Sequence, residues 1–303
     1  MAARSIRSRG RLVVLTAVLL AALIAGHRLI PNVRGLGSLV DTGVPYLGLA
    51  VPALAFAALL RRSRLGLAAV ALPAVVWTVL VGAAWLPADG GPVRLRVVSQ
   101  NLMAGNPDPA ATVARLAGTG ADLVAVQELT DGDRPAVEDA LRASHPHTTT
   151  ISTVGLWSRY PVSESSGVDT GLSWTRALRA VIDTPDGELV VYVVHLGSAR
   201  AGATALRDRT VARLAERLRA EPARRLIVLG DFNTSTSDRV IVPLTSMLRD
   251  AQADAGRGPG FTWPAELPVM RPDQVLYRGL TAASAGVLRT PASDHRAVTA
   301  GFA

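Results

Sequence analysis

Seven polar or ionisable side chains stand at the ends of short apolar runs in the last two-thirds of the chain. They are Asn101, Glu128, His195, Asp231, Asn233, Asp294 and His295. Carboxylate and amide oxygens are hard ligands, and because the chain has no cysteine they favour Mg²⁺ or Mn²⁺ over zinc. Two imidazoles beside them can move protons or stabilise charge near neutral pH. The residue types therefore predict metal-assisted acid–base chemistry.

Each residue also has an ordinary structural interpretation. Asn101 is typical of a turn cap, and His195 of a satisfied histidine at a strand end. The segment GDFN at 230–233 is more specific, because glycine and aspartate directly after LIVL predict a tight turn that exposes a carboxylate. The ordered recurrence of such residues favours a site over seven unrelated structural roles.

The elements that must position these residues follow from apolar patterning. Strand-like runs lie at 95–99, 123–127, 189–195 and 226–229, and helix-like runs at 109–117, 135–143 and 203–220. Alternating strands and helices over some 210 residues predict an α/β sandwich. Polar residues that repeatedly follow buried strands predict a site at one edge of the sheet.

The first third of the chain has a different composition. Three uncharged or nearly uncharged apolar runs span residues 12–30, 44–60 and 65–86. A membrane-spanning helix needs about 20 such residues. The runs predict a membrane anchor over residues 1–91 with three transmembrane helices, followed by a Gly/Pro linker at 88–92 and a domain at 92–303. A cleavable signal peptide for the first run and a buried core for all three are the alternatives.

Charge suggests both the orientation and the class of partner. Residues 1–91 hold nine arginines against two aspartates, a net charge of +7, whereas residues 92–303 hold 23 arginines against 22 acidic residues, a net charge of +1. The Arg-rich segments flank the first run and separate the second from the third. The positive-inside rule then predicts a multi-pass protein of the cell membrane with an extracytoplasmic catalytic domain. A folded domain of near-neutral charge makes nucleic acid an unlikely partner.

Several motifs in order carry a family resemblance. They are SQNLMAGN (99–106), DLVAVQEL (122–129), LWSRYPV (156–162), VVHLG (193–197), LGDFNTSTSD (229–238), RPDQVLYRG (271–279) and SDHRAV (293–298). This series resembles the endonuclease/exonuclease/phosphatase superfamily, the DNase I-like fold, from about residue 95 to 301. The resemblance implies a four-layer α/β/β/α sandwich. Membrane helices before such a domain are most similar to the VanJ-type glycopeptide-resistance proteins.

The resemblance also implies roles for the candidate residues. Glu128 would be the principal ligand of a divalent metal, Mg²⁺ or Mn²⁺, assisted by Asn101. Asp231 would orient or deprotonate the attacking water, with Asn233 beside it. His195 would donate a hydrogen bond to a phosphate oxygen.

The last motifs add a second imidazole. His295 would be held by Asp294, which would also reach a metal. Asp273 stands where the family has its Ile-Asp-His/Tyr motif, but its neighbours here are Pro272 and Gln274, so the role of Gln274 stays open. The stretch 234–238 has no G-x-S-x-G context and predicts a loop or helix cap.

Location narrows the expected substrate. A domain tethered close to the outer leaflet predicts a lipid-linked phosphate such as undecaprenyl diphosphate, and the resemblance suggests a link to glycopeptide (teicoplanin) resistance. The alternatives are an extracellular nuclease or phosphodiesterase, including a sphingomyelinase-like enzyme, and a non-catalytic ligand-binding module on a membrane anchor. Trp157 and Trp263, both predicted in loops, would contact lipid or ligand, or serve ordinary packing.

Overall fold

A computed structural model describes residues 10–85, 90–200 and 202–303. The chain divides into two compact units: one runs to Leu86 and includes Ser237–Arg239, and the other comprises the rest from Pro87. Arg4, Arg7 and Arg9 of the predicted orientation signal, and Ala88 and Asp89 of the predicted linker, lie outside the described residues.

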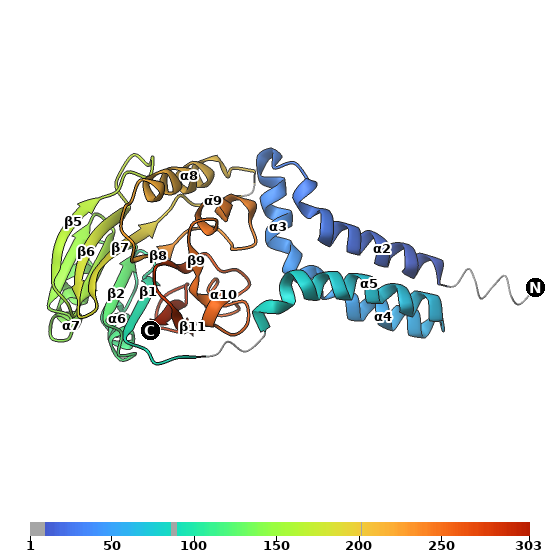
Figure 1. The fold of residues 1–303 in the computed structure, drawn as a ribbon, viewed down its shortest axis with the longest axis horizontal. Coiled ribbons are helices and arrows are strands. Elements are labelled where there is room, and N and C mark those ends of the chain that lie inside the picture. Colours follow the sequence, from blue (N-terminus) through green and yellow to red (C-terminus); the bar gives the residue numbers. More distant parts are fainter. Residues whose placement is uncertain (1–9, 86–89, 201) are drawn as a thin grey trace, which may run out of the picture. The chain divides into compact units, whose positions relative to one another are not determined.

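The N-terminal unit is helical. Its elements are α2 (Arg11–Gly26), η1 (His27–Leu29), η2 (Val33–Gly35), α3 (Leu36–Leu47), α4 (Ala50–Leu60), α5 (Arg64–Val81) and η3 (Gly82–Trp85). Helix α5 begins where the Ser63 hydroxyl accepts a hydrogen bond from the Gly66 amide at 3.0 Å, a side-chain N-cap. It packs against α2 and α4 through small residues that include Ala17 and Ala58 (Figure 1).

The outward faces of these helices are also apolar. Leu12, Leu19, Leu60 and Val79 are among the large side chains that stay exposed. A helix that is apolar all round is typical of a membrane span or of a deeply buried core helix. Within the described residues, Arg11–Leu29 and Arg64–Val81 are long and apolar enough to cross a membrane.

The second predicted span, 44–60, is not one continuous helix. It covers the end of α3 and all of α4, and the helical pair Val33–Leu47 and Ala50–Leu60 bends by 54° at the break. Pro52 supplies the physical reason, because it has no amide hydrogen to donate to the carbonyl four residues earlier. The pair therefore makes a third crossing only if the bent segment counts as one span.

The second unit contains two six-stranded sheets. In sheet A the order is β11 (Ala282–Leu288), β12 (Ala297–Phe302), β1 (Leu95–Asn101), β2 (Leu123–Gln127), β4 (Val154–Ser158), β3 (His147–Ile151). In sheet B the order is β5 (Val162–Gly167), β6 (Ala177–Thr184), β7 (Gly187–His195), β8 (Leu226–Asp231), β10 (Asp273–Arg278), β9 (Arg249–Asp250). The helical segments are α6 (Pro109–Ala117), α7 (Arg134–Arg142), α8 (Ala205–Arg219), η4 (Arg239–Ile241), α9 (Val242–Thr245) and α10 (Ala251–Ala255).

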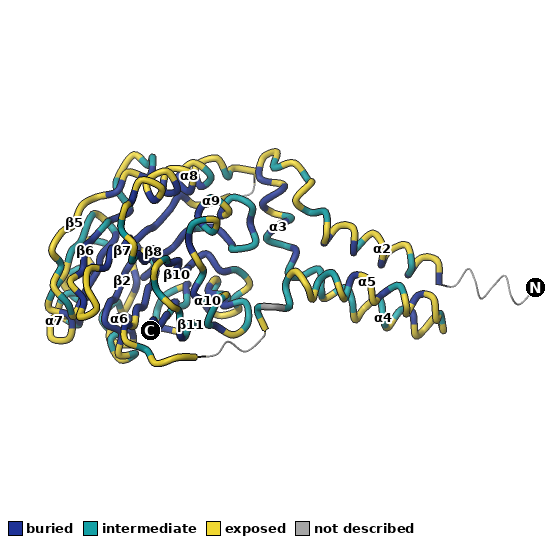
Figure 2. Tube along the Cα trace, in the orientation of Figure 1, coloured by how far each residue is buried: buried dark blue, intermediate teal, exposed yellow. Residues whose placement is uncertain are grey.

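The sheets pack face to face around the main core. Alternate residues such as Val97 of β1 and Val191 of β7 point into this shared interior. The intervening residues, such as Val98 and Tyr192, point outward and are covered by helices. Because both faces are buried, the central strands are nearly continuous apolar runs, and Figure 2 shows these strands as the most buried part of the unit.

Helices cover the outer faces and complete four layers. Helices α6 and α7 pack on sheet A, and α8 and α9 pack on sheet B (Figure 1). Helix α6 begins with Asp108 accepting a hydrogen bond from the Ala111 amide at 2.9 Å and has Pro109 in its first turn. The predicted four-layer α/β/β/α sandwich is confirmed.

Strand register brings distant segments to one edge. Strands β1 and β2 are parallel with Asn101 opposite Gln127, so Asn101 and Glu128 leave the sheet together. Strands β7 and β8 are parallel with His195 opposite Asp231. Strand β10 runs antiparallel to β8 and places Asp273 opposite Asp231.

Candidate active site

Asn101 connects two carboxylates that come from different sheets. Its amide nitrogen donates to Glu128 Oε1 at 3.1 Å and to Asp231 Oδ2 at 3.0 Å, while its oxygen accepts from the Met103 amide at 2.9 Å. Asn101 and Asp231 are buried. The edges of the two sheets therefore meet at this amide, as the strand-end pattern predicts.

The backbone turns sharply at Glu128. Its φ is 57°, in the left-handed region that glycine favours, and its Oε2 accepts a hydrogen bond from the Ala104 amide at 2.7 Å. Asn233 also has a positive φ, 50°. Such conformations cost about 1–3 kcal/mol each and concentrate at functional sites, where the surrounding structure fixes them.

Asp231 lies within strand β8 and not in the predicted tight turn after it. The carboxylate is not exposed by a tight turn, because the strand continues through Asp231 and leaves the residue only 2% exposed. Gly230, with φ 137°, permits the close approach of β7, since a Cβ there would lie 2.0 Å from the Val194 carbonyl oxygen. The Asn233 amide then donates to Asp231 Oδ1 at 2.7 Å.

His195 lies beside both acids. Its Nε2 is 3.7 Å from Glu128 Oε1 and 3.8 Å from Asp231 Oδ2, and its Nδ1 is buried without a hydrogen-bond partner among the described residues. Burial lowers the pKa of His195 and outweighs the nearby charge of Asp231. His195 is therefore a neutral imidazole near pH 7.

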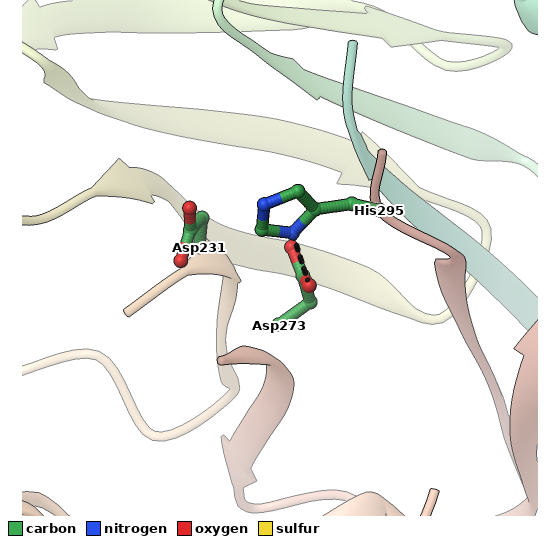
Figure 3. A group of neighbouring side chains, drawn as sticks. All are labelled: Asp231, Asp273 and His295. Carbon is green, nitrogen blue, oxygen red and sulfur yellow. Dashed lines mark hydrogen bonds and ion pairs between the residues drawn. The ribbon is translucent and has the colours of Figure 1, made fainter. Parts of the chain in front are cut away.

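His295 is held by Asp273 and not by Asp294, which corrects the sequence prediction. Its Nδ1 lies 2.8 Å from Asp273 Oδ2, which also accepts the Thr262 hydroxyl at 2.6 Å. Figure 3 shows the other ring nitrogen of His295 on the side of Asp231. The carboxylate of Asp294 is exposed and lies 3.4 Å from the Trp263 indole nitrogen.

The Asp273 contact sets the protonation of His295. Burial alone would lower the pKa of His295, but the charge and hydrogen bond of Asp273 outweigh it and raise the pKa to about 9. The site thus holds a neutral imidazole at His195 and a protonated one at His295.

The structure also places the two tryptophans and the glutamine whose roles the sequence left open. Trp157 lies in β4, not in a loop, and is buried in the core, which leaves ordinary packing as its role. Trp263 is 39% exposed. Gln274 is buried and donates to the Thr234 carbonyl at 2.6 Å, so it braces the loop after β8.

The sequence did not predict that Arg176 lies beside the site. Arg176, directly before β6, accepts the His195 amide on its carbonyl at 2.9 Å and lies with its guanidinium 3.5 Å from His195 Nε2. Only cross-strand pairing of β6 with β7 brings the two residues together. The available signal was an arginine just ahead of an apolar run.

Comparison with known proteins agrees with this geometry. The profile of the Endonuclease/Exonuclease/phosphatase family matches residues 98–295. The chain belongs to that family. Members of the endonuclease/exonuclease/phosphatase family are metal-dependent phosphoesterases or nucleases, and the chain is accordingly a hydrolase. Comparison with curated proteins found no match to this sequence.

Solved structures share the fold of this family at low identity. A mannosyl-6-phosphatase from Bacteroides thetaiotaomicron VPI-5482 is 16% identical with a TM-score of 0.59, and 69% of this chain and 100% of that chain are covered. D. rerio TDP2 complexed with single strand DNA product is 18% identical with a TM-score of 0.59, with 69% and 98% covered. A conserved protein of unknown function from Enterococcus faecalis V583 is 15% identical with a TM-score of 0.60, with 69% and 99% covered.

The residues present fit the divalent metal that the family implies. Glu128 and Asp231 approach a single neutral amide, and a small hard cation would offset the repulsion between the two carboxylates. Asn101 turns its nitrogen toward them, so to act as a ligand it would rotate its amide and release Met103.

A second group of potential ligand atoms belongs to a different role. Asp231, Asp273 and His295 offer atoms within 4.8 Å of one another. Because Asp273 Oδ2 already engages Nδ1 of His295 at 2.8 Å, the Asp273–His295 pair suits charge stabilisation better than metal ligation.

Proposed function

We propose that this protein is a membrane-anchored, Mg²⁺- or Mn²⁺-dependent phosphohydrolase that acts on a lipid-linked phosphate such as undecaprenyl diphosphate. The observation that carries the proposal is the joint presence, in one chain, of the assembled acid–imidazole site and of helices apolar enough to span a membrane. A link to glycopeptide resistance follows if the substrate belongs to the cell-wall cycle.

The site supports a direct attack by water. A metal bound at Glu128 and Asn101 would supply positive charge to the phosphoryl oxygens. Asp231 takes one proton from the attacking water as its oxygen bonds to phosphorus, and the bond to the leaving oxygen breaks. Neutral His195 donates one ring N–H to a phosphoryl oxygen.

The second imidazole meets the charge that develops. His295 is already protonated and turns its free nitrogen toward Asp231, so it donates a charged hydrogen bond without needing to gain a proton (Figure 3). Asp273 keeps this ring in place and compensates its charge.

The substrate class is supported by composition. The apolar helices keep the enzyme in a bilayer, where a lipid-linked phosphate presents its head group, and the arginine distribution supports an extracytoplasmic catalytic unit. The net charge of +1 over residues 92–303 gives little attraction for long polyanions, which disfavours a nuclease.

The test uses the full-length protein in detergent with Mg²⁺ and undecaprenyl diphosphate, and measures phosphate release. We expect release that a chelator abolishes and that Glu128→Ala reduces by at least about 1000-fold. The proposal fails if wild type and Glu128→Ala release equal amounts.

Parallel assays with plasmid DNA and sphingomyelin distinguish the other enzyme classes. Faster cleavage of DNA would make the protein a nuclease, and faster cleavage of sphingomyelin a phospholipase-type diesterase. Binding of the diphosphate without turnover, unchanged in Asp231→Asn and His295→Ala, would identify a ligand-binding module instead.

A further inference from the structure

Arg176 is a half-buried guanidinium that forms no ion pair with a carboxylate of the described residues. Its Nη2 donates to the Leu196 carbonyl at 3.2 Å and its Nη1 lies 3.5 Å from His195 Nε2, while its Nε is buried with no hydrogen-bond partner among the described residues. Within that part of the chain, no carboxylate oxygen lies within 4.0 Å of it. A guanidinium has five N–H donors, so most of the donors of Arg176 are free.

Three other buried or half-buried arginines in the same unit have more hydrogen-bond partners. Arg179, three residues along β6, donates to Glu221 at 2.7 Å and 3.4 Å. Arg271 donates to both oxygens of Asp250, at 3.1 Å for one of them. Arg278 donates to three backbone carbonyls. Arg176 differs in that, among the described residues, its only hydrogen-bond partners are one carbonyl and one imidazole, while Asp231 and Glu128 act on it through charge without touching it.

Trp174 fixes the direction of this cation. The guanidinium carbon lies 5.1 Å from the centroid of the Trp174 ring, and the ring is 50% exposed. Stacking on an aromatic face orients the planar fork of an arginine. The free donors are therefore held beside His195, at the border between the acid cluster and solvent.

We propose that Arg176, oriented by Trp174, binds the oxygens of a terminal phosphoryl group and makes the site selective for dianionic substrates, phosphomonoesters or diphosphates, over singly charged phosphodiesters. This inference rests on the proposed function, because it assigns the substrate class of the same site. A planar fork matches two phosphate oxygens, and a terminal phosphoryl group carries the additional negative charge that an unpaired guanidinium compensates.

The test compares Arg176→Ala with the exposed control Arg213→Ala, which lies on α8 and pairs with Glu216. The substrates are para-nitrophenyl phosphate, farnesyl diphosphate and bis(para-nitrophenyl) phosphate. We expect Arg176→Ala to lower kcat/KM for the first two by on the order of 100-fold and for the diester by less than about 5-fold. Arg176→Lys should retain part of the activity, since it keeps the charge without the fork. Equal losses on all three substrates, or no loss, would overturn the inference.

Binding of inorganic phosphate gives a readout that is independent of turnover. We expect its dissociation constant, measured by calorimetry on the full-length protein with Mg²⁺, to rise by about 10-fold or more in Arg176→Ala and to stay unchanged in Arg213→Ala. Trp174→Ala, which keeps the cation, should weaken phosphate binding several-fold and covers the case in which Arg176→Ala fails to fold.

The two proposals fail in different ways. If wild type hydrolyses none of the substrates but phosphate binding still depends on Arg176, the proposed function is wrong and the phosphate site stands. If the lipid diphosphate is hydrolysed and Arg176→Ala leaves the dissociation constant of phosphate unchanged, only the assignment of Arg176 is wrong. Preference for farnesyl diphosphate over the soluble monoester would identify the lipid head group as the source of the phosphoryl group.

Discussion

Two polar clusters of the α/β unit differ in how their charged groups are paired. The Asp231 cluster comprises Asn101, Glu128, Arg176, His195, Asp231, Asp273 and His295. The Glu221 cluster comprises Arg179, Tyr192 and Glu221. In the second, Glu221 accepts from Arg179 at 2.7 Å and from the Tyr192 hydroxyl at 2.8 Å, and no side chain of the cluster has a buried atom without a partner among the described residues.

The Asp231 cluster leaves polar atoms unused. Three buried side-chain atoms in it, Arg176 Nε, His195 Nδ1 and Asp273 Oδ1, have no hydrogen-bond partner within the described ranges. Unmade hydrogen bonds at buried sites cost stability, about 1–3 kcal/mol each. The difference teaches that the Glu221 cluster stabilises the folded unit. The Asp231 cluster instead lowers stability by leaving buried polar atoms without partners, and a bound substrate and metal would supply those partners.

Of the acid-to-amide substitutions, Asp231→Asn should show the largest difference between its effect on activity and its effect on stability. We expect Asp231→Asn to lower phosphate release by about 1000-fold, because the amide cannot accept the proton of the attacking water. Its free energy of unfolding should stay within about 1 kcal/mol of wild type, since the change removes a charge that lies near Glu128 and Asp273. The measurements are steady-state kinetics and urea unfolding of the same preparations. A large loss of stability with normal turnover would assign Asp231 to the fold.

The matching change at Glu221 should have the opposite result. We expect Glu221→Gln to lower the free energy of unfolding by about 2–3 kcal/mol, because Arg179 loses its charged partner in a buried position. Activity per folded molecule should not change. Glu164→Gln is the control, since Glu164 contacts the same arginine at 3.4 Å but its side chain is 71% exposed, and it should cost less than about 0.5 kcal/mol. Equal effects of the two changes would contradict a structural role for burial at Glu221.

Local patterns in the sequence were enough to predict most of the sheet edge. Asn101 ends β1 and Glu128 directly follows β2, close to the strand ends that the apolar runs predict, and the strand at 123–127 has the predicted bounds. The family resemblance added the four layers, which the fold confirms.

Contacts set by tertiary register could not be predicted in this way. Asp273 and His295 are 22 residues apart and meet across the two sheets, because Asp273 begins β10 of sheet B and His295 lies just before β12 of sheet A. The adjacent Asp294 is the simpler guess from the sequence. Arg176 reaches His195 only across the β6–β7 pair. The break between α3 and α4 depends on the backbone at Pro52, and a prediction from the apolar content of residues 44–60 does not take the backbone into account.

The two clusters should lose stability at opposite ends of the pH range, the Glu221 cluster in acid and the Asp231 cluster in alkali. Burial alone would raise the pKa of Glu221, but hydrogen bonds from Arg179 and Tyr192 outweigh it and lower the pKa to about 2. The folded pKa lies below the unfolded value, so this stabilisation is present above about pH 4.5 and is lost as the pH falls toward 2. The Glu221 cluster therefore weakens in acid.

His295 should produce the corresponding loss in alkali. Its folded pKa, about 9, lies above the ordinary histidine value of 6.5, so the stabilisation is fully present below about pH 6.5 and is lost as the pH rises through 9. The charges of Asp273, Asp231 and Asp294 raise the pKa of His295, and neutral His195 adds no charge. We expect the free energy of unfolding to fall by on the order of 2 kcal/mol between pH 7 and 10, and His295→Gln to remove that fall. If His295→Gln keeps the same alkaline slope, the charge on His295 does not stabilise the folded site, and Asp273 holds a neutral ring.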